Sequence, residues 1–170
     1  MATIMLFGSS TIKTVPQTVV DWLYEYNKQG HKFIVGDKKG AETDLHRALS
    51  SSGASVNTQL YSMGKSINNR FEITNKIFDT YYDEGTKTVQ IVLRGAEEGS
   101  IDESFKPYEI TGVEKEMDIQ GNSEYYNFKY KQMIKDCDIA IGVVTADDKV
   151  TTHIIQWLNI YNKPCYLFNM

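Results

Sequence analysis

The feature that most constrains the fold of this chain is a repeated alternation between two kinds of sequence. Short runs rich in apolar and β-branched residues are separated by segments in which apolar residues recur with helical period, and the runs lie at 3–8, 32–37, 58–63, 88–93, 138–145 and 165–168. Parallel strands need a long connection, usually a helix, so this alternation is typical of a parallel sheet covered by helices. We expect an α/β fold, a three-layer sandwich around a mostly parallel sheet.

Local signals place the helices. Thr14 and Gln17 have the spacing of a capping box, which predicts the start of the first helix, and Gly30 predicts its end. Two more helices are expected directly after the second and the fifth runs, because apolar residues follow there at intervals of three and four. The segments at about 70–83 and 123–136 are also predicted to be helices.

The segment from about 95 to 121 departs from this alternation. Its stretch FKPYEITGVEKEMDI alternates apolar and polar residues, which predicts a β-hairpin that turns at Thr111-Gly112. The segment is acidic, with eight Asp or Glu residues and two lysines between Glu97 and Asp118. We expect residues 1–170 to form one domain with an insertion at about 95–121.

Charge and composition argue against several classes of partner. The net charge of −4 gives no long-range attraction for a nucleic acid polymer, and no apolar run approaches the ~18 residues that cross a bilayer membrane. The chain enters its first apolar run without a basic region or a cleavage site, so a cytoplasmic location is expected. Cys137, Cys165 and the three histidines lack the spacing of metal ligands. We therefore expect no metal site and no required cofactor.

The junction between the second run and the following helix reads Gly36-Asp37-Lys38-Lys39-Gly40-Ala41. A helix that begins directly after a parallel strand directs unpaired N–H groups and the positive end of its dipole at one point. Glycine lets a ligand approach the backbone there. The junction therefore predicts an anion site, although a tight turn with two solvated lysines explains the same residues.

Two other strand ends have a similar composition. The first run ends in Gly8-Ser9-Ser10-Thr11, and the fifth ends in TADDKVTTH, residues 145–153. The carboxyl ends of parallel strands lie at one edge of a sheet, where open α/β proteins bind their ligands. Helix capping is the alternative explanation for the hydroxyl groups and the aspartates, and His153 suits either packing or a ligand contact.

Three blocks occur in the order MLFGSS (5–10), FIVGDKKGAETDLHRAL (33–49) and MIKDCDIAIGVVTADDKVTTHIIQWLNIYNKPCYLF (133–168). In these blocks the chain resembles the SLOG superfamily, which joins LOG-type phosphoribohydrolases, molybdenum-cofactor carriers and small nucleotide-ligand-binding proteins. The resemblance implies a Rossmann-like fold and a nucleotide-derived ligand. The residues that match the motifs of this group are Gly8, Ser9, Ser10, Gly36, Asp37, Gly40, Ala41, Glu42, Lys129, Met133, Asp138, Thr151 and His153.

The chain departs from the LOG-type pattern P-G-G-x-G-T-x-x-E at two positions. Val150 replaces the glycine before the threonine, and Ile154 replaces the glutamate. An aliphatic side chain cannot assist the departure of a base or stabilise an oxocarbenium ion, so the LOG reaction does not follow from the resemblance. The Arg-Asn pair of the family is Lys129-Tyr130 here, which keeps the positive charge but loses a planar bidentate donor.

Three functions follow as alternatives. The first is a carrier, sensor or sequestering module that binds a nucleotide or a nucleotide-derived small molecule at the sheet edge. The second is an N-glycosidase or phosphoribohydrolase for a nucleoside monophosphate or an NAD-like substrate, with Glu42 or Asp37 as its carboxylate. The third is a regulatory or structural protein that acts through a partner, which the acidic segment favours. The ligand-binding residues expected for the first two are Gly8, Ser9, Ser10, Gly36, Asp37, Lys38, Gly40, Ala41, Lys129, Lys149, Thr151, Thr152 and His153.

Aromatic pairs predict self-association. Tyr81-Tyr82 and Tyr125-Tyr126 fall on the two helices predicted at 70–83 and 123–136. Neighbouring side chains on a helix cannot all face one core, and aromatic residues left outside a core are common in interfaces. We therefore expect a homo-oligomer.

Overall fold

The computed structural model describes residues 1–64 and 74–170. Within these residues the chain forms an eight-stranded sheet in the order β6-β5-β4-β3-β2-β1-β7-β8, flanked by helices. Contacts within the chain group it into two compact units. The first contains Met1–Tyr61 and Tyr130–Met170, and the second contains Lys76–Lys129. The predicted excursion at 95–121 lies inside the second unit, which begins before it and ends after it.

The first unit is built on parallel strands. They are β1 (Thr3–Gly8), β2 (Lys32–Gly36), β3 (Thr58–Met63), β7 (Ile139–Val144) and β8 (Cys165–Asn169), in the order β3-β2-β1-β7-β8. The central strand β1 pairs with β2 and with β7, and its residues from Ile4 to Phe7 are at most 1% exposed. A strand that is buried on both faces is apolar along its whole length, which explains the unbroken apolar run TIMLFG.

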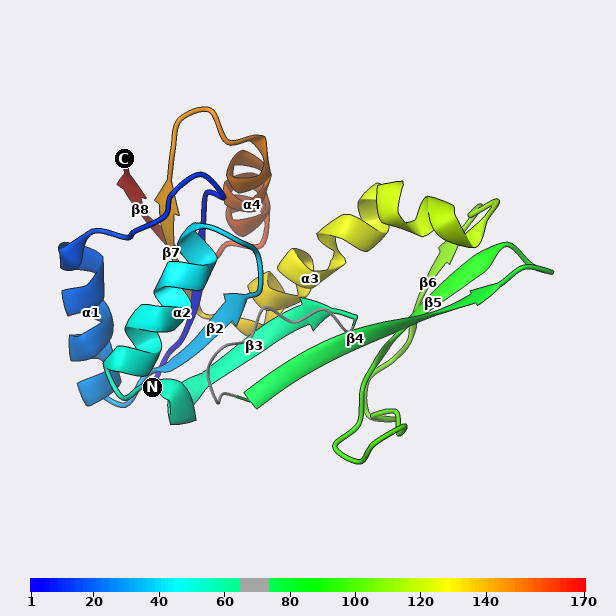
Figure 1. The fold of residues 1–170 in the computed structure, drawn as a ribbon, viewed down its shortest axis with the longest axis horizontal. Coiled ribbons are helices and arrows are strands. Elements are labelled where there is room, and N and C mark those ends of the chain that lie inside the picture. Colours follow the sequence, from blue (N-terminus) through cyan, green and yellow to red (C-terminus); the bar gives the residue numbers. More distant parts are fainter. Residues whose placement is uncertain (65–73) are drawn as a thin grey trace. The chain divides into compact units, whose positions relative to one another are not determined.

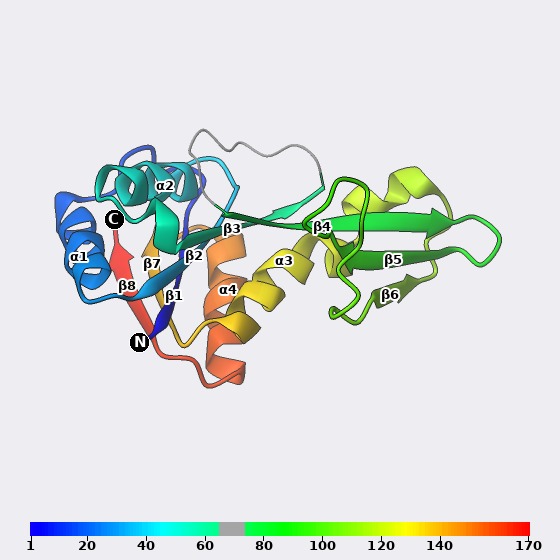
Figure 2. The same cartoon turned by 90° about the horizontal axis from the view of Figure 1, so that it is seen from below.

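Helices cover both faces of these strands. They are α1 (Gln17–Lys28), α2 (Ala41–Ser51), the last turns of α3 (Ser123–Asp136) and α4 (Lys149–Ile160), with a short 3-10 helix at Ser55–Asn57. The helix α2 lies over β1 and β2 and packs against α1 (Figure 1). Figure 2 shows α1 and α2 on one side of the strands and α4 on the other. The predicted α/β fold, a Rossmann-like sandwich around a mostly parallel sheet, is confirmed.

The strand order reverses its direction between β1 and β7. The chain moves from β1 through β2 to β3 on one side, whereas it moves from β7 to β8 on the other side. Helices that follow β1 and β7 therefore cover opposite faces, and their connections separate at the carboxyl ends of these two strands. Such a switch point is the usual ligand site of an open α/β sheet.

The second unit is antiparallel. Its strands are β4 (Thr74–Asp83), β5 (Thr88–Leu93) and β6 (Tyr108–Thr111), followed by a 3-10 helix at Glu116–Gly121 and the first turns of α3. The strand β5 pairs with both neighbours. Aromatic rings make its core, with centroids of Phe78 and Phe128 5.1 Å apart, and those of Phe78 and Phe105 5.6 Å apart.

Three local predictions are wrong. The helix predicted at about 70–83 is the strand β4 from Thr74 on, and residues 70–73 lie outside the described part of the chain. The stretch FKPYEITGVEKEMDI supplies only the strand β6, which pairs with β5 and ends at Thr111, so the predicted hairpin does not form. No capping box forms at the start of α1, where Pro16 is the N-cap residue and Gln17 donates to Asp21.

The two tyrosine pairs each have one exposed member. Tyr81 lies on β4 rather than on a helix and is 54% exposed, and Tyr126 on α3 is 55% exposed. The hydroxyl of Tyr82 donates to the carbonyl of Val113 at 2.7 Å inside the second unit. Self-association stays a prediction.

Candidate functional site

Ser9 joins the three strand ends that the sequence singles out. Its side chain is fully buried just after β1. The amide of Ser9 donates to Val143 at 3.0 Å, its hydroxyl oxygen accepts from the amide of Thr145 at 2.9 Å, and its carbonyl accepts from the amide of Ala41 at 3.1 Å. The loop after β1 therefore touches the end of β7 and the first turn of α2.

Glycines allow the loops to approach so closely. Gly40 has φ +95°, and a Cβ at this position would collide with the backbone of Ser10. A Cβ on Gly8 would collide with the Cβ of Ala41 and would lie 2.6 Å from the carbonyl oxygen of Val143. The backbones at Gly8 and Gly40 are thus fixed by contacts within the protein, and glycine is required at both positions whether or not a ligand binds.

The start of α4 is capped from within. The carboxylate of Asp148 accepts from the amides of Val150 at 2.9 Å and Thr151 at 3.2 Å. The hydroxyls of Thr151 and Thr152 donate to the carbonyl of Asp148 at 3.0 and 2.8 Å. Helix capping, the alternative explanation of these residues, is therefore confirmed for Asp148, while the two threonines bond back to the cap residue.

The pKa of Asp148 reports its surroundings. Burial by itself would raise this pKa, but the amide of Thr151, the positive charge of Lys38, the hydroxyl of Ser9 and the amide of Val150 together lower it below its ordinary value. Lys38 and Ser9 therefore act on the same carboxylate. This places residues from the β1, β2 and β7 loops around one point.

The ammonium group of Lys38 is the unusual group of this edge. Its Nζ atom is inaccessible to solvent and has no hydrogen-bond partner among the described residues. The backbone of Lys38 is held in place, because its carbonyl accepts from the hydroxyl of Thr43 at 3.2 Å. Asp148 supplies a nearby negative charge but no hydrogen bond to this ammonium, and the unused N–H donors of Lys38 favour a negatively charged ligand. The neighbouring Lys39, in contrast, is exposed.

Glu42 is a buried carboxylate in the first turn of α2. Its side chain is fully buried, and its Oε2 atom accepts from the hydroxyl of Tyr130 at 3.0 Å. A carboxylate near a helix N-terminus gains from the helix dipole.

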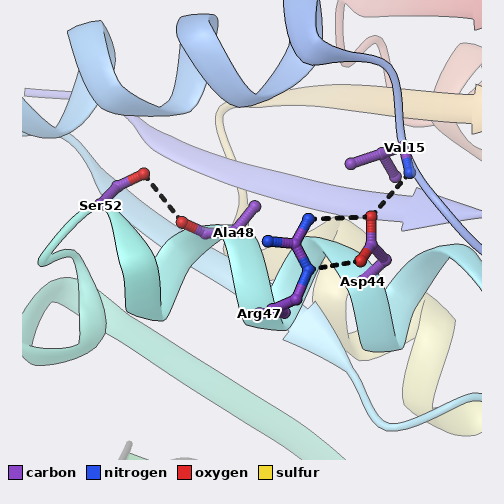
Figure 3. A network of polar contacts seen from close by, with 5 residues as sticks. All are labelled: Val15, Asp44, Arg47, Ala48 and Ser52. Atoms are coloured by element: carbon purple, nitrogen blue, oxygen red, sulfur yellow. Dashed lines mark hydrogen bonds and ion pairs between the residues drawn. The ribbon is translucent and has the colours of Figure 1, made fainter.

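A second carboxylate of α2 has a structural role that the sequence did not reveal. Asp44 accepts from the buried amide of Val15 at 2.7 Å and from Nε of Arg47 at 2.6 Å (Figure 3). Ser52 donates to the carbonyl of Ala48 at 2.8 Å at the other end of the helix (Figure 3). Asp44 therefore holds the segment between β1 and α1 against α2. The spacing of Asp44 and Arg47, three residues apart on one helix, is a local signal for their ion pair but not for the bond from Val15.

The remaining predicted residues lie at varying exposure. Gly36 is buried at the end of β2, Asp37 is half-buried, and Ser10 and Lys149 are exposed. His153 is also exposed, and its ring lies 6.0 Å from that of Trp157. Lys129 is 7% exposed and belongs to the second unit. Ligand binding by the predicted set stays a prediction.

A hollow of about 550 Å³ lies in the second unit, at the turn between β4 and β5. It contains none of the predicted site residues, and its carboxylates Asp83 and Glu84 repel an anion. Its lining residues are Tyr81, Tyr82, Asp83, Glu84, Gly85, Thr88 and Gln90.

The described part of the chain contains no group of three or more His, Cys, Asp and Glu side chains arranged to hold a metal ion. None of its helices has both the length and the apolar character needed to span a membrane. Both cysteines are free thiols, and burial raises the pKa of each to about 11. A thiol with such a pKa is a weak nucleophile at neutral pH.

Comparison of the chain with protein-family models, with curated proteins and with solved structures gave no match.

Proposed function

We propose that this protein binds an anionic small molecule, a nucleotide or a nucleotide-derived molecule, at the carboxyl edge of β1, β2 and β7. The ammonium of Lys38, which is buried and has no hydrogen-bond acceptor among the described residues, although its charge acts on Asp148, is the observation that supports this most directly. Phosphate oxygens supply the acceptors that the ammonium lacks, and charge-assisted hydrogen bonds of this kind are strong. The site lies at the switch point of the strand order, as ligand sites of open α/β sheets do.

The neighbouring groups suit a phosphate better than a bare cation or an apolar ligand. The first turn of α2 begins at Ala41, beside Lys38, and presents the positive end of its dipole. Gly40 carries no side chain that would cover this turn. Asp148 keeps its negative charge, which two amides of α4 and the nearby charge of Lys38 offset in part. Binding without turnover fits a carrier, sensor or sequestering module.

Titration calorimetry with AMP, ADP-ribose and inorganic pyrophosphate tests the proposal. Lys38→Ala is expected to weaken the affinity for the tightest of these probes by at least about tenfold, equivalent to about 1.4 kcal/mol. Lys39→Ala is the matched control, because it removes an adjacent lysine that is exposed. Equal losses in both variants would contradict a special role for the buried ammonium. Native mass spectrometry of the purified protein identifies a molecule that is already bound.

The second candidate function is cleavage of an N-glycosidic bond. The buried Glu42 carboxylate with its Tyr130 hydroxyl partner favours it, since such cleavage needs a carboxylate near the ribose. Release of free base from AMP or NAD is measured by chromatography. We expect Glu42→Gln to abolish release and Tyr130→Phe, a milder change, to slow it about tenfold. If no base is released at high protein concentration, the glycosidase candidate is contradicted.

A further inference from the structure

On the outer edge of β8, backbone N–H and C=O groups do not bond to any described strand. The strand β8 is the last in the strand order. On its inner side the amide of Ala140 donates to Pro164, and the amide of Met170 donates to Val144, both at 2.9 Å. In a parallel ladder alternate residues bond to the same neighbour. The even-numbered residues from 164 to 170 therefore face β7, and the N–H and C=O groups of Cys165, Leu167 and Asn169 point outward.

Exposed apolar side chains occur on β8 and at the end of the helix α4 that precedes it. Tyr166 is 62% exposed and Leu167 is 41% exposed, and neighbouring residues of a strand point to opposite faces. Both faces of β8 therefore present apolar surface. Among the described residues of the first unit, eight large apolar side chains are exposed, and five of them lie between 160 and 170: Ile160, Tyr161, Tyr166, Leu167 and Met170. Clusters of this kind mark interaction surfaces.

The edge lacks the charges that keep strand edges apart. β8 has no charged residue, and the one charged side chain just before it, Lys163, donates inward to the carbonyl of Cys137 at 2.7 Å. The strand β6, at the other end of the strand order, has the exposed Glu109 and is preceded by Pro107. Charge and proline are the usual protection of an edge strand. The edge of β8 has neither within the strand, so two such edges meet without electrostatic repulsion.

We propose that two copies of this chain form a two-fold dimer by antiparallel pairing of their β8 strands. A two-fold axis makes identical strands antiparallel, and the outward groups of Cys165, Leu167 and Asn169 are symmetric about Leu167. An axis at Leu167 places it opposite the partner's Leu167 and places Cys165 opposite the partner's Asn169. Every outward N–H and C=O group of the strand then has a partner. The two sheets become one continuous sheet.

The same register brings apolar side chains together. Tyr166 lies opposite the partner's Phe168, and Met170 lies opposite the partner's Pro164. Aromatic cross-strand pairs stabilise antiparallel sheets. Phe168 is already fixed within its own copy, because its ring packs edge-on against Trp22 with centroids 6.2 Å apart. A second copy is therefore a better partner for the edge of β8 than an unrelated strand, because its own Phe168 and Pro164 lie opposite Tyr166 and Met170.

Sedimentation equilibrium tests the association. The native chain is expected to have a mass of about 39 kDa, twice the 19.4 kDa of one copy. Leu167→Lys places two positive charges face to face at the axis and is expected to return the mass to 19.4 kDa. Val56→Lys is the control, because Val56 is 88% exposed and lies just before β3 and not on β8. The dimer is expected to persist in this variant. A native chain that is monomeric, or a Leu167→Lys variant that stays dimeric, overturns the proposal.

Disulfide trapping tests the register without depending on the lysine variant. Residues at a hydrogen-bonded antiparallel pair have Cα atoms about 5.5 Å apart, within the range that a disulfide spans after a small adjustment of the strands. Leu167→Cys combined with Cys165→Ser is therefore expected to cross-link on oxidation with glutathione disulfide. Asn169→Cys is expected to cross-link to the partner's Cys165. The cross-link disappears when Cys165→Ser is added, because the two copies of position 169 are then about 14 Å apart. Any other pattern of cross-links overturns the register.

Discussion

Gly40 combines a positive φ of +95° with close contact to the backbone of Ser10. Gly40→Ala therefore adds both backbone strain and a collision, and we expect it to lower the free energy of unfolding by about 2–4 kcal/mol. Gly53→Ala is the control, because Gly53 has φ +73° but no other atom lies within 4 Å of the point that a Cβ would occupy. Its expected loss is about 1 kcal/mol, for strain alone. Urea unfolding measures both, and equal losses would show that the loop at Gly40 relaxes.

The Asp148 carboxylate makes the stability of the protein depend on pH. Its pKa is lowered in the folded protein from the ordinary value of 3.8, so the folded state binds this proton more weakly than the unfolded state does. The stabilisation is complete above that value and is lost as the pH falls through 3.8 towards the folded pKa. We expect Asp148→Asn to be less stable than the native chain at pH 7, with the difference shrinking below pH 3.8. Urea unfolding from pH 7 to pH 3 tests this, and a difference independent of pH would contradict it.

At the residue scale, the sequence predicted features that depend on local chain geometry. The cap at Asp148 follows from its position at a helix start, whereas Gly8 and Gly40 were placed at strand ends without the close contacts that require glycine there. The bond from Val15 to Asp44 joins residues 29 apart, and only the packing of α1 on α2 brings them together. The burial of Lys38 Nζ is likewise set by neighbouring loops. Sequence spacing carries no information about such contacts.

At the element scale, strands that have an apolar run of their own were predicted well, and β4, which lacks one, was not. The run TVQIVL was recognised as β5 from its own composition. The segment TNKIFDTYYD has no such unbroken apolar run, because one face of β4 packs on the aromatic core while Tyr81 on the other is exposed. Its antiparallel pairing with β5, from Phe78 opposite Leu93 to Asp83 opposite Thr88, decides its conformation. Pairing with a neighbouring strand overrides local preference here.

The aromatic core of the second unit supports a prediction about these strands. Phe78 is fully buried against Phe105 and Phe128, so Phe78→Ala is expected to destabilise the second unit by about 3–5 kcal/mol. Hydrogen exchange is expected to accelerate at the amides of β4, β5 and β6, and to stay unchanged in β1 and β7 of the first unit. Tyr81→Ala, on the exposed face of the same strand, is the control with little effect. An equal acceleration throughout the chain would show that the two units unfold together.

At the scale of the whole molecule, the α/β class followed from the alternation of runs, and the parallel half of the sheet from the helices between them. The antiparallel half was not predicted in its extent, because the excursion predicted at 95–121 rests on a local break in the alternation of runs and on one alternating stretch. The contacts instead group Lys76–Lys129 into the second unit. Composition marks a change of surface charge, whereas the boundary of a compact unit depends on contacts between distant segments.

Charge is distributed unevenly along the chain, and this predicts that salt stabilises the second unit but weakens anion binding by the first. Residues 76–129 contain twelve acidic and six basic side chains, which leaves ten acidic and twelve basic side chains in the remainder. Screening weakens repulsion within the acidic unit, so raising NaCl from about 20 to about 200 mM is expected to slow hydrogen exchange in β4, β5 and β6. The same salt weakens the attraction between Lys38 and an anion, and the affinity for pyrophosphate is expected to fall several-fold. Potassium acetate at equal ionic strength is the control for specific ion effects. Screening by salt is the common cause of both effects. Faster exchange in the second unit at high salt would contradict charge repulsion within that unit, and tighter pyrophosphate binding at high salt would contradict an attraction between Lys38 and the anion.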